Sequence, residues 1–260
     1  MPKAATIPGP ESTRTDTAGP SPEEMEIARE VQACLLPRRQ PRLETLEYAS
    51  CYLPALEVGG DYYDFLENGP GHLGFAVGDI CGKGVSAALM MATLQATLRS
   101  QFATGAYDLT RLLRSVNELI CECTASQHFA GLFLGDYDDD SRRLRYTNCG
   151  HAPPLLVHAD GEFERLGPTA TVLGAFEDWK CETREIALVP GDVLLMFTDG
   201  VSETTNRAGR ELGERGIVEA LRACRRRSLP GLVEELIQAV REFGDYHQKD
   251  DMTLVVARPR

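Results

Sequence analysis

The 260-residue sequence has no apolar run approaching the ~20 residues that span a bilayer, and its N-terminus lacks the apolar core of a secretory signal. Basic residues are also scarce: 27 Lys and Arg stand against 39 Asp and Glu, so the net charge is −12. A surface for nucleic acid or anionic lipid needs a basic patch. We therefore expect no nucleic-acid partner and no membrane partner. Acids that gather in one place would instead need a cation.

The sequence also lacks any Cys-x-x-Cys pair. Eight cysteines are present, but their spacing gives little support to a zinc site. In a chain of this length they are typical of reduced, mostly buried thiols of a cytosolic protein. We therefore predict a cytoplasmic location.

The composition divides the chain into three parts. Residues 1–20 are rich in Pro, Thr, Ser, Ala and Gly without apolar periodicity, which predicts a disordered tail. Residues 21–38 begin with a capping serine and a proline, and Pro37 ends the helical pattern. This segment is predicted to be a linker or regulatory helix. Its apolar stripe has to pack on the domain or on a second copy of the same helix. Residues 39–260 form the remaining domain, and apolar residues make up 43% of the chain, enough for a substantial core.

The order of the predicted elements indicates the fold class. Longer periodic stretches predict two helix pairs, 85–102 with 109–123 and 214–226 with 230–242. The helices do not alternate with single strands as βαβ units do, so we predict an α+β fold: a four-layer α-β-β-α sandwich of two mainly antiparallel sheets flanked by helix pairs. The predicted strands, short apolar stretches bounded by turn residues, cover 46–53, 61–66, 72–79, 130–137, 144–148, 155–158, 163–166, 184–188, 193–198 and 252–257.

Acids recur at the ends of these strands, beside glycine or a turn. Asp61 follows two glycines at the start of a strand, and Asp79 and Asp199 each end an apolar strand ahead of glycines. Asp250 and Asp251 stand directly before the last strand. A single Asp-Gly is usually only a turn. The joint pattern predicts that at least four carboxylates converge where the strand ends meet.

A bare cluster of this kind is unfavourable. Two carboxylates repel each other by roughly 4 kcal/mol at about 4 Å near a protein surface. Divalent cations cancel that charge, and all-oxygen ligands select Mg²⁺ or Mn²⁺ over zinc. Two such ions sharing a carboxylate can activate a water and clamp a phosphoryl oxygen.

Five motifs, in this order, resemble those of the metal-dependent (PPM-type, or type 2C) Ser/Thr protein phosphatases, and within them the bacterial SpoIIE/RsbU branch. The resemblance runs from about Glu26 to the C-terminus, and the helix at 21–38 is similar to the segment that precedes the phosphatase domain in that branch. The motifs read EVGGDYYDF, VGDICGKGVSAALMMA, TNCGHAPPLL, LLMFTDGVSE and DDMTLVVAR.

The resemblance implies a binuclear metal centre that holds two Mn²⁺ or Mg²⁺ ions. Asp79 would bridge the ions, with the Ile80 carbonyl as a neighbouring ligand, and Asp199 and Asp250 would complete the first coordination shell. Asp61 would lie at the site and bind metal directly or through water. Asp251 is the sixth implied residue, and two roles remain open for it: it would orient its neighbour or serve a third ion.

The resemblance also implies the activity: hydrolysis of phosphoserine or phosphothreonine by a water between the metals, without a phosphoenzyme. The implied substrate is a phosphorylated STAS-type anti-sigma-factor antagonist in a partner-switching pathway. Relatives in the wider family carry a His after the bridging Asp-Gly as acid for the leaving group, whereas Asp79 is followed by Ile80 and Cys81, so that role is unassigned.

Several alternatives remain open at this point. The chain could be a binding or regulatory module that kept the fold and lost turnover, or a hydrolase of small phosphomonoesters. His151 could act as a base or hold its loop, and Lys83 could meet a phosphate or remain solvated. The helix at 21–38 could form a homodimer or receive an upstream regulator.

Overall fold

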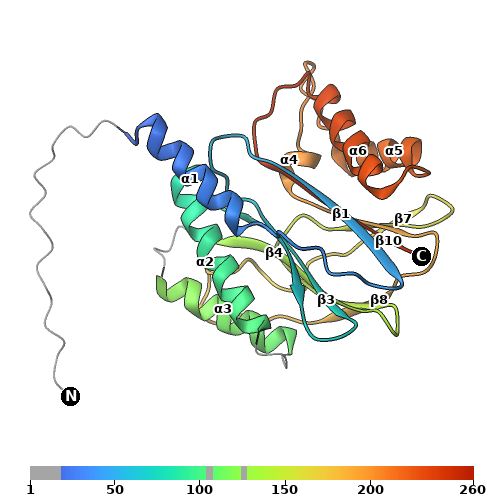
Figure 1. The fold of residues 1–260 in the computed structure, drawn as a ribbon, viewed down its shortest axis with the longest axis horizontal. Coiled ribbons are helices and arrows are strands. Elements are labelled where there is room, and N and C mark those ends of the chain that lie inside the picture. The colour runs from blue at the N-terminus through green and yellow to red at the C-terminus, as the bar shows by residue number, and fades with distance from the viewer. Residues whose placement is uncertain (1–18, 104–107, 124–127) are drawn as a thin grey trace, which may run out of the picture.

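The computed structural model describes residues 19–103, 108–123 and 128–260 (Figure 1). The disordered tail predicted for residues 1–20 lies outside these ranges except for its last two residues. Among the described residues, no helix combines the length and the apolar character needed to cross a bilayer.

Ten strands form two five-stranded sheets, and every strand pair within them is antiparallel. The first sheet has the order β1-β10-β9-β6-β7, with bounds Leu46–Leu53, Met252–Pro259, Val193–Phe197, Leu155–Val157 and Phe163–Arg165. The second has the order β2-β3-β4-β5-β8, with bounds Tyr62–Glu67, His72–Ile80, Ala130–Asp138, Arg143–Cys149 and Arg184–Ala187.

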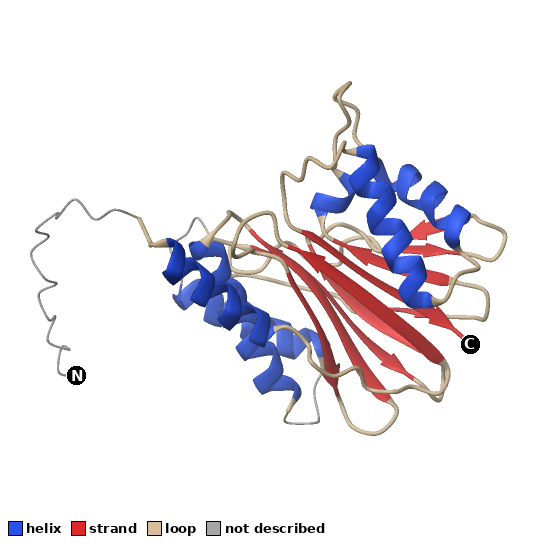
Figure 2. Ribbon diagram, turned by 45° about the horizontal axis from the view of Figure 1, so that its top comes forward, coloured by secondary structure: helices blue, strands red, loops and turns tan. Residues whose placement is uncertain are grey.

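Helices cover the outer face of each sheet, as Figure 2 shows. Helices α2 and α3 pack on the second sheet and α5 and α6 on the first, while α1 lies against α2 and α4 follows β9. This confirms the predicted four-layer α-β-β-α sandwich. The helix bounds are Pro22–Leu35 for α1, Val85–Phe102 for α2, Leu109–Cys123 for α3, Asp199–Ser202 for α4, Gly213–Cys224 for α5 and Leu229–Phe243 for α6.

Three apolar clusters match the three interfaces between the four layers. The cluster between the sheets includes Phe75 and Phe133 from one sheet and Met196 and Val255 from the other. The outer clusters join each sheet to its helix pair. Alternate residues of each central strand therefore face two different apolar layers, which explains why these strands read as nearly continuous apolar runs.

The prediction of separate elements was accurate, with one exception. The bounds of β1, α2 and α3 are those predicted, and the other strand and helix ends differ by at most two residues. The short helix α4 was not predicted; β9 ends at Phe197, so Asp199 opens a helical turn and does not lie inside a strand. Asp108 caps α3, since its Oδ1 accepts from the backbone N–H of Thr110 and Arg111.

Helix α1 is attached to the domain through both polar and apolar contacts, and its Leu35 packs against the cluster of α2 and α3. Ser21 caps it and forms a capping box with Glu24. Its one buried residue is Gln32, while Ile27 and Val31 are 60% and 57% exposed. The helix therefore packs on its own domain with one edge and leaves part of its apolar stripe uncovered.

Candidate metal centre

The ends of four strands bring the predicted acids together between the two sheets. Asp61 and Asp79 flank β2 and β3 of one sheet, while Asp199, Asp250 and Asp251 flank β9 and β10 of the other. The electrostatic neighbours of Asp79 are Asp199, Asp250 and Asp251, and those of Asp61 are Asp79 and Asp251. Folding thus unites five acids that are up to 190 positions apart in the chain.

Asp79 lies at the centre of this group. Burial, followed by the charges of Asp199, Asp250 and Asp251, raises the pKa of Asp79 to about 7, while Lys83 acts in the opposite direction. Burial and the charge of Asp250 also raise the pKa of Asp199. The protein therefore holds these carboxylates where their negative charge is unfavourable, which is the electrostatic condition for recruiting cations.

Asp61 is the most deeply buried acid of the group, with 2% exposure. Its Oδ2 accepts hydrogen bonds from the hydroxyls of Thr198 and Thr253, both at 2.6 Å. Burial raises the pKa of Asp61 well above its usual range although both hydroxyls favour the carboxylate. Thr253 lies in β10 and Thr198 directly follows β9 of the first sheet, whereas Asp61 directly precedes β2 of the second, so these bonds join the two sheets at the acid group.

Asp251 uses both of its carboxylate oxygens to hold the segment between β1 and β2. Oδ1 accepts from the backbone N–H of Ala55 at 2.7 Å, and Oδ2 accepts from Gly60 at 2.7 Å and Asp61 at 3.4 Å. The sequence left two roles open for Asp251, orienting its neighbour or serving a third ion. These contacts favour the orienting role.

The paired glycines before Asp61 are explained by close packing. A Cβ on Gly59 would lie 2.2 Å from Asp251 Oδ2 and 2.4 Å from the Tyr52 hydroxyl oxygen. A Cβ on Gly60 would lie 3.2 Å from the Ile80 carbonyl oxygen, so this carbonyl faces the loop that carries Asp61. Only residues without side chains let the loop come this close to both groups.

Asp250 lies at the open side of the group. Its Oδ2 is 2.6 Å from Lys83 Nζ, which also donates to the Lys249 carbonyl at 2.9 Å. The hydrogen bond to Asp250 raises the pKa of Lys83. Lys83 is thus a cation that partly neutralises the acids, and a hollow of about 230 Å³ opens next to Asp199 and Asp250.

The donor set fits hard divalent cations. All candidate side-chain donors are carboxylate oxygens, with the Ile80 carbonyl beside them, and their mutual repulsion is what a dication would offset. In the described part of the chain, no three His, Cys, Asp or Glu side chains are already arranged to hold an ion.

Other candidates from the sequence have structural roles. His151 is 6% exposed, and its Nδ1 hydrogen-bonds the Ala152 carbonyl at 2.8 Å while burial lowers its pKa to about 4. The basic run at the end of α5 is partly engaged with carbonyls, since Arg222 donates to Gly161 and Arg225 to Gly191.

Sequence reasoning missed Thr198, Thr253 and Gln32. The two threonines stand beside the acids in the motifs FTDG and DDMT, so their place in the sequence could have indicated that they lie at the site. Gln32 had none: its side-chain amide donates to the Gly59 carbonyl at 2.7 Å and accepts from the Gly59 N–H at 3.0 Å, across 27 positions of the chain.

Similarity to known proteins identifies the family. Residues 69–260 match the family described as Stage II sporulation protein E (SpoIIE). The chain belongs to the SpoIIE family. It is a member of the SpoIIE/RsbU branch of the PPM-type protein serine/threonine phosphatases, whose members depend on metal ions.

Individual relatives of this SpoIIE-family chain cover most of its length. The phosphoserine phosphatase RsbU of Bacillus subtilis (strain 168) is 28% identical over 236 residues, 90% of this chain and 70% of RsbU. The structure of the RsbU and RsbW domains of Rv1364c from Mycobacterium tuberculosis has a TM-score of 0.72 and 31% identity, covering 85% of this chain and 61% of that one. The SiaA-PP2C domain of Pseudomonas aeruginosa shares the fold, with a TM-score of 0.79 and 24% identity over 91% of this chain and 96% of that one.

Proposed function

We propose that this chain hydrolyses phosphoserine or phosphothreonine in a protein substrate, at a centre of two Mn²⁺ or Mg²⁺ ions held by Asp79, the Ile80 carbonyl, Asp199 and Asp250. The observation that carries the proposal is the group of carboxylates around Asp79. Burial and the charges of these carboxylates raise the pKa of Asp79 to about 7. When bound, the ions would supply an activated water and neutralise charge on the phosphoryl oxygens.

The remaining residues of the group position the ligands. Asp61, held by Thr198 and Thr253, stands beside Asp79, where it can hold metal directly or through water. Asp251 fixes the loop that carries Asp61. We therefore assign Asp251 to orientation, with service to a third ion as the alternative.

The proposal predicts that Asp79→Asn abolishes Mn²⁺-dependent hydrolysis of a phosphoserine peptide while the fold remains intact by circular dichroism. The matched control is Asp140→Asn, an exposed acid in the β4–β5 turn, which should retain full turnover. Unchanged turnover in Asp79→Asn would refute the metal assignment.

The proposed substrate is a phosphorylated STAS-domain protein. Support comes from the likeness to the phosphoserine phosphatase RsbU. Turnover of a phosphorylated STAS protein should exceed that of p-nitrophenyl phosphate at least 100-fold in kcat/KM. Equal turnover would favour a small-phosphomonoester hydrolase, and no metal-titrated turnover of either would favour a binding module of the same fold.

We further propose that α1 is a regulatory segment that pairs with a second copy of itself or with an upstream regulator. The exposed side chains of Ile27 and Val31, four positions apart on one face, support this proposal. Light scattering and activity of the full chain and of a variant lacking residues 1–37 test it, and deletion that changes neither would refute it. The cytoplasmic location predicted from the cysteines stays a prediction.

A further inference from the structure

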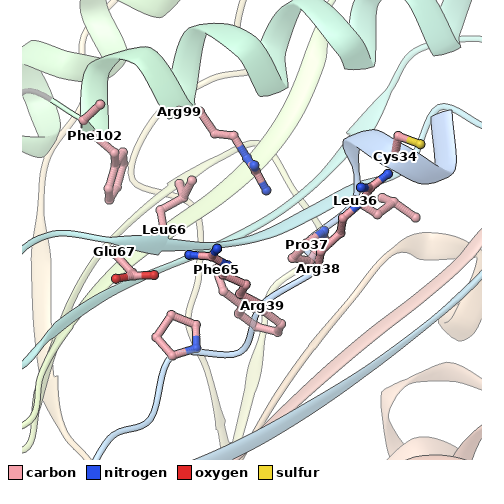
Figure 3. Close-up of a pocket in the computed structure, with 12 residues that line it drawn as sticks. Cys34, Leu36, Pro37, Arg38, Arg39, Phe65, Leu66, Glu67, Arg99 and Phe102 are labelled. Carbon is pink, nitrogen blue, oxygen red and sulfur yellow. The ribbon is translucent and has the colours of Figure 1, made fainter. Parts of the chain in front are cut away.

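A second hollow, of about 440 Å³, lies apart from the acid group (Figure 3). Three segments line it: the chain from Cys34 through Pro41, the end of β2 and the end of α2. None of the carboxylates of the metal centre contributes to its walls. The proposed phosphatase activity therefore gives this hollow no role.

One wall of the hollow is apolar and firmly packed. Phe65, Leu66 and Phe102 are 7%, 4% and 3% exposed, so the domain core holds them in place. Leu36 and Pro37 also line the hollow, from the segment after α1 (Figure 3). An apolar group that enters the hollow would leave water without requiring the walls to rearrange.

The polar side of the hollow carries more positive than negative charge, with three arginines against one acid, Glu67. Arg99 lines the hollow but is neutralised, since its Nε and Nη2 donate to the buried carboxylate of Asp64 at 2.7 and 3.0 Å. Arg38 and Arg39 are exposed, and no hydrogen bond or ion pair to either is present in the described structure. With Glu67 as the one acid in the lining, these two guanidinium groups leave the hollow with a net positive charge in a chain whose net charge is −12.

We propose that this hollow binds a small amphipathic anion. Its apolar body would lie against Leu66 and Phe102, and its carboxylate, phosphate or sulfonate head would meet Arg38 and Arg39, whose planar groups pair with such oxygens in bidentate fashion. The volume lies within the range of about 300–1,000 Å³ typical of small-molecule sites. An acidic protein segment would use the charge but not the enclosed apolar wall.

The occupant would contact three segments at once. The chain after α1, the end of α2 and the end of β2 would share one ligand, and β2 begins directly after Asp61. Binding at this site would therefore depend on the position of α1 relative to the domain.

The test uses 8-anilinonaphthalene-1-sulfonate, an aromatic sulfonate that fluoresces in apolar surroundings. We expect saturable binding to one site on the full chain. The double variant Arg38→Ala/Arg39→Ala should weaken binding at least 10-fold. The double variant Arg215→Ala/Arg226→Ala removes the same charge from exposed arginines elsewhere and should change binding less than 2-fold.

Cys34 reports whether the probe occupies this hollow. Its thiol is exposed and lines the wall, so the bound probe should protect it from N-ethylmaleimide, as read by peptide mass mapping. Equal effects of the two double variants, or labelling of Cys34 that the probe does not slow, would overturn the proposal. Displacement of the probe by tetraglutamate at equal concentration would also overturn the proposal, because binding would then depend on charge alone and not on the apolar wall.

Discussion

At the scale of single residues, the glycines around the acids explain how a charged group is held between two sheets. The Cβ position of Gly59 is taken by Asp251 and Tyr52, and that of Gly200 lies 2.0 Å from the Asp251 carbonyl oxygen. These positions have no room for a methyl group, and the clashing atoms belong to the acid that fixes the Asp61 loop. The packing of the loop that carries Asp61 thus depends on the absence of a side chain at Gly59.

We predict that Gly59→Ala destabilises the protein by roughly 2–4 kcal/mol, the size of severe overpacking at a buried site. Gly167→Ala is the matched control, since nothing lies within 4 Å of its Cβ position. Urea unfolding of both variants measures the change. Equal stabilities would mean that the loop moves aside at little cost, and that it does not hold Asp251 as described.

His151 supplies a second prediction at this scale, because its pKa of about 4 lies below the ordinary value of 6.5. Below pH 6.5 the unfolded chain binds a proton at this residue that the folded chain does not bind. Stability is therefore complete above pH 6.5 and falls as the pH drops toward 4, by up to about 1.4 kcal/mol per pH unit from this residue.

The measurement is the difference in unfolding free energy between the wild type and His151→Asn from pH 7 to pH 4. The amide of asparagine can still donate to the Ala152 carbonyl, but it does not titrate. The difference should shift in favour of the variant as the pH falls. A difference that is independent of pH would contradict the buried neutral imidazole.

At the scale of elements, the helices and strands follow from local pattern, whereas the attachment of α1 does not. Apolar periodicity and the proline at its end predicted this helix, but periodicity placed its apolar stripe in the contact. In the structure the one buried residue of the helix is Gln32, a polar residue, whose side-chain amide pairs with the buried backbone N–H and C=O of Gly59.

We predict that Gln32→Ala loosens α1 and weakens metal binding. Loss of the side-chain amide leaves the buried N–H and C=O of Gly59 without partners, which costs about 1–3 kcal/mol. Hydrogen exchange should accelerate in residues 22–35 and 57–61, and the Mn²⁺ concentration for half-maximal activity should rise at least 3-fold. Glu30→Ala, on the exposed face of α1, is the control.

Unchanged exchange in residues 57–61 of Gln32→Ala would show that the loop does not depend on the helix. A faster exchange confined to residues 22–35, with unaltered Mn²⁺ dependence, would limit Gln32 to docking the helix. Only the combined effect supports a physical link from α1 through Gly59 to Asp61.

At the scale of the whole molecule, the acid group joins the two sheets and lowers stability when no cation is present. Ions that bind only the folded state shift the unfolding equilibrium by mass action. We predict that saturating Mn²⁺ raises the thermal midpoint by several degrees in the wild type and not in Asp79→Asn. Differential scanning calorimetry with and without a chelator measures both, and equal shifts in the two proteins would indicate that the ions bind elsewhere.

The sequence by itself determined the elements and the family. Helix and strand bounds follow from local periodicity and turn residues, which act over a few positions, and the five motifs carry the resemblance in a fixed order. The tertiary structure alone decided which groups meet: Asp61 with Thr198 and Thr253, Gly59 with Gln32, and the two unpaired arginines with an apolar wall. The physical reason is that these contacts join segments distant in the chain, Asp61 with the threonines across the two sheets and the others between α1, or the chain after it, and its own domain, and no local pattern encodes such distances.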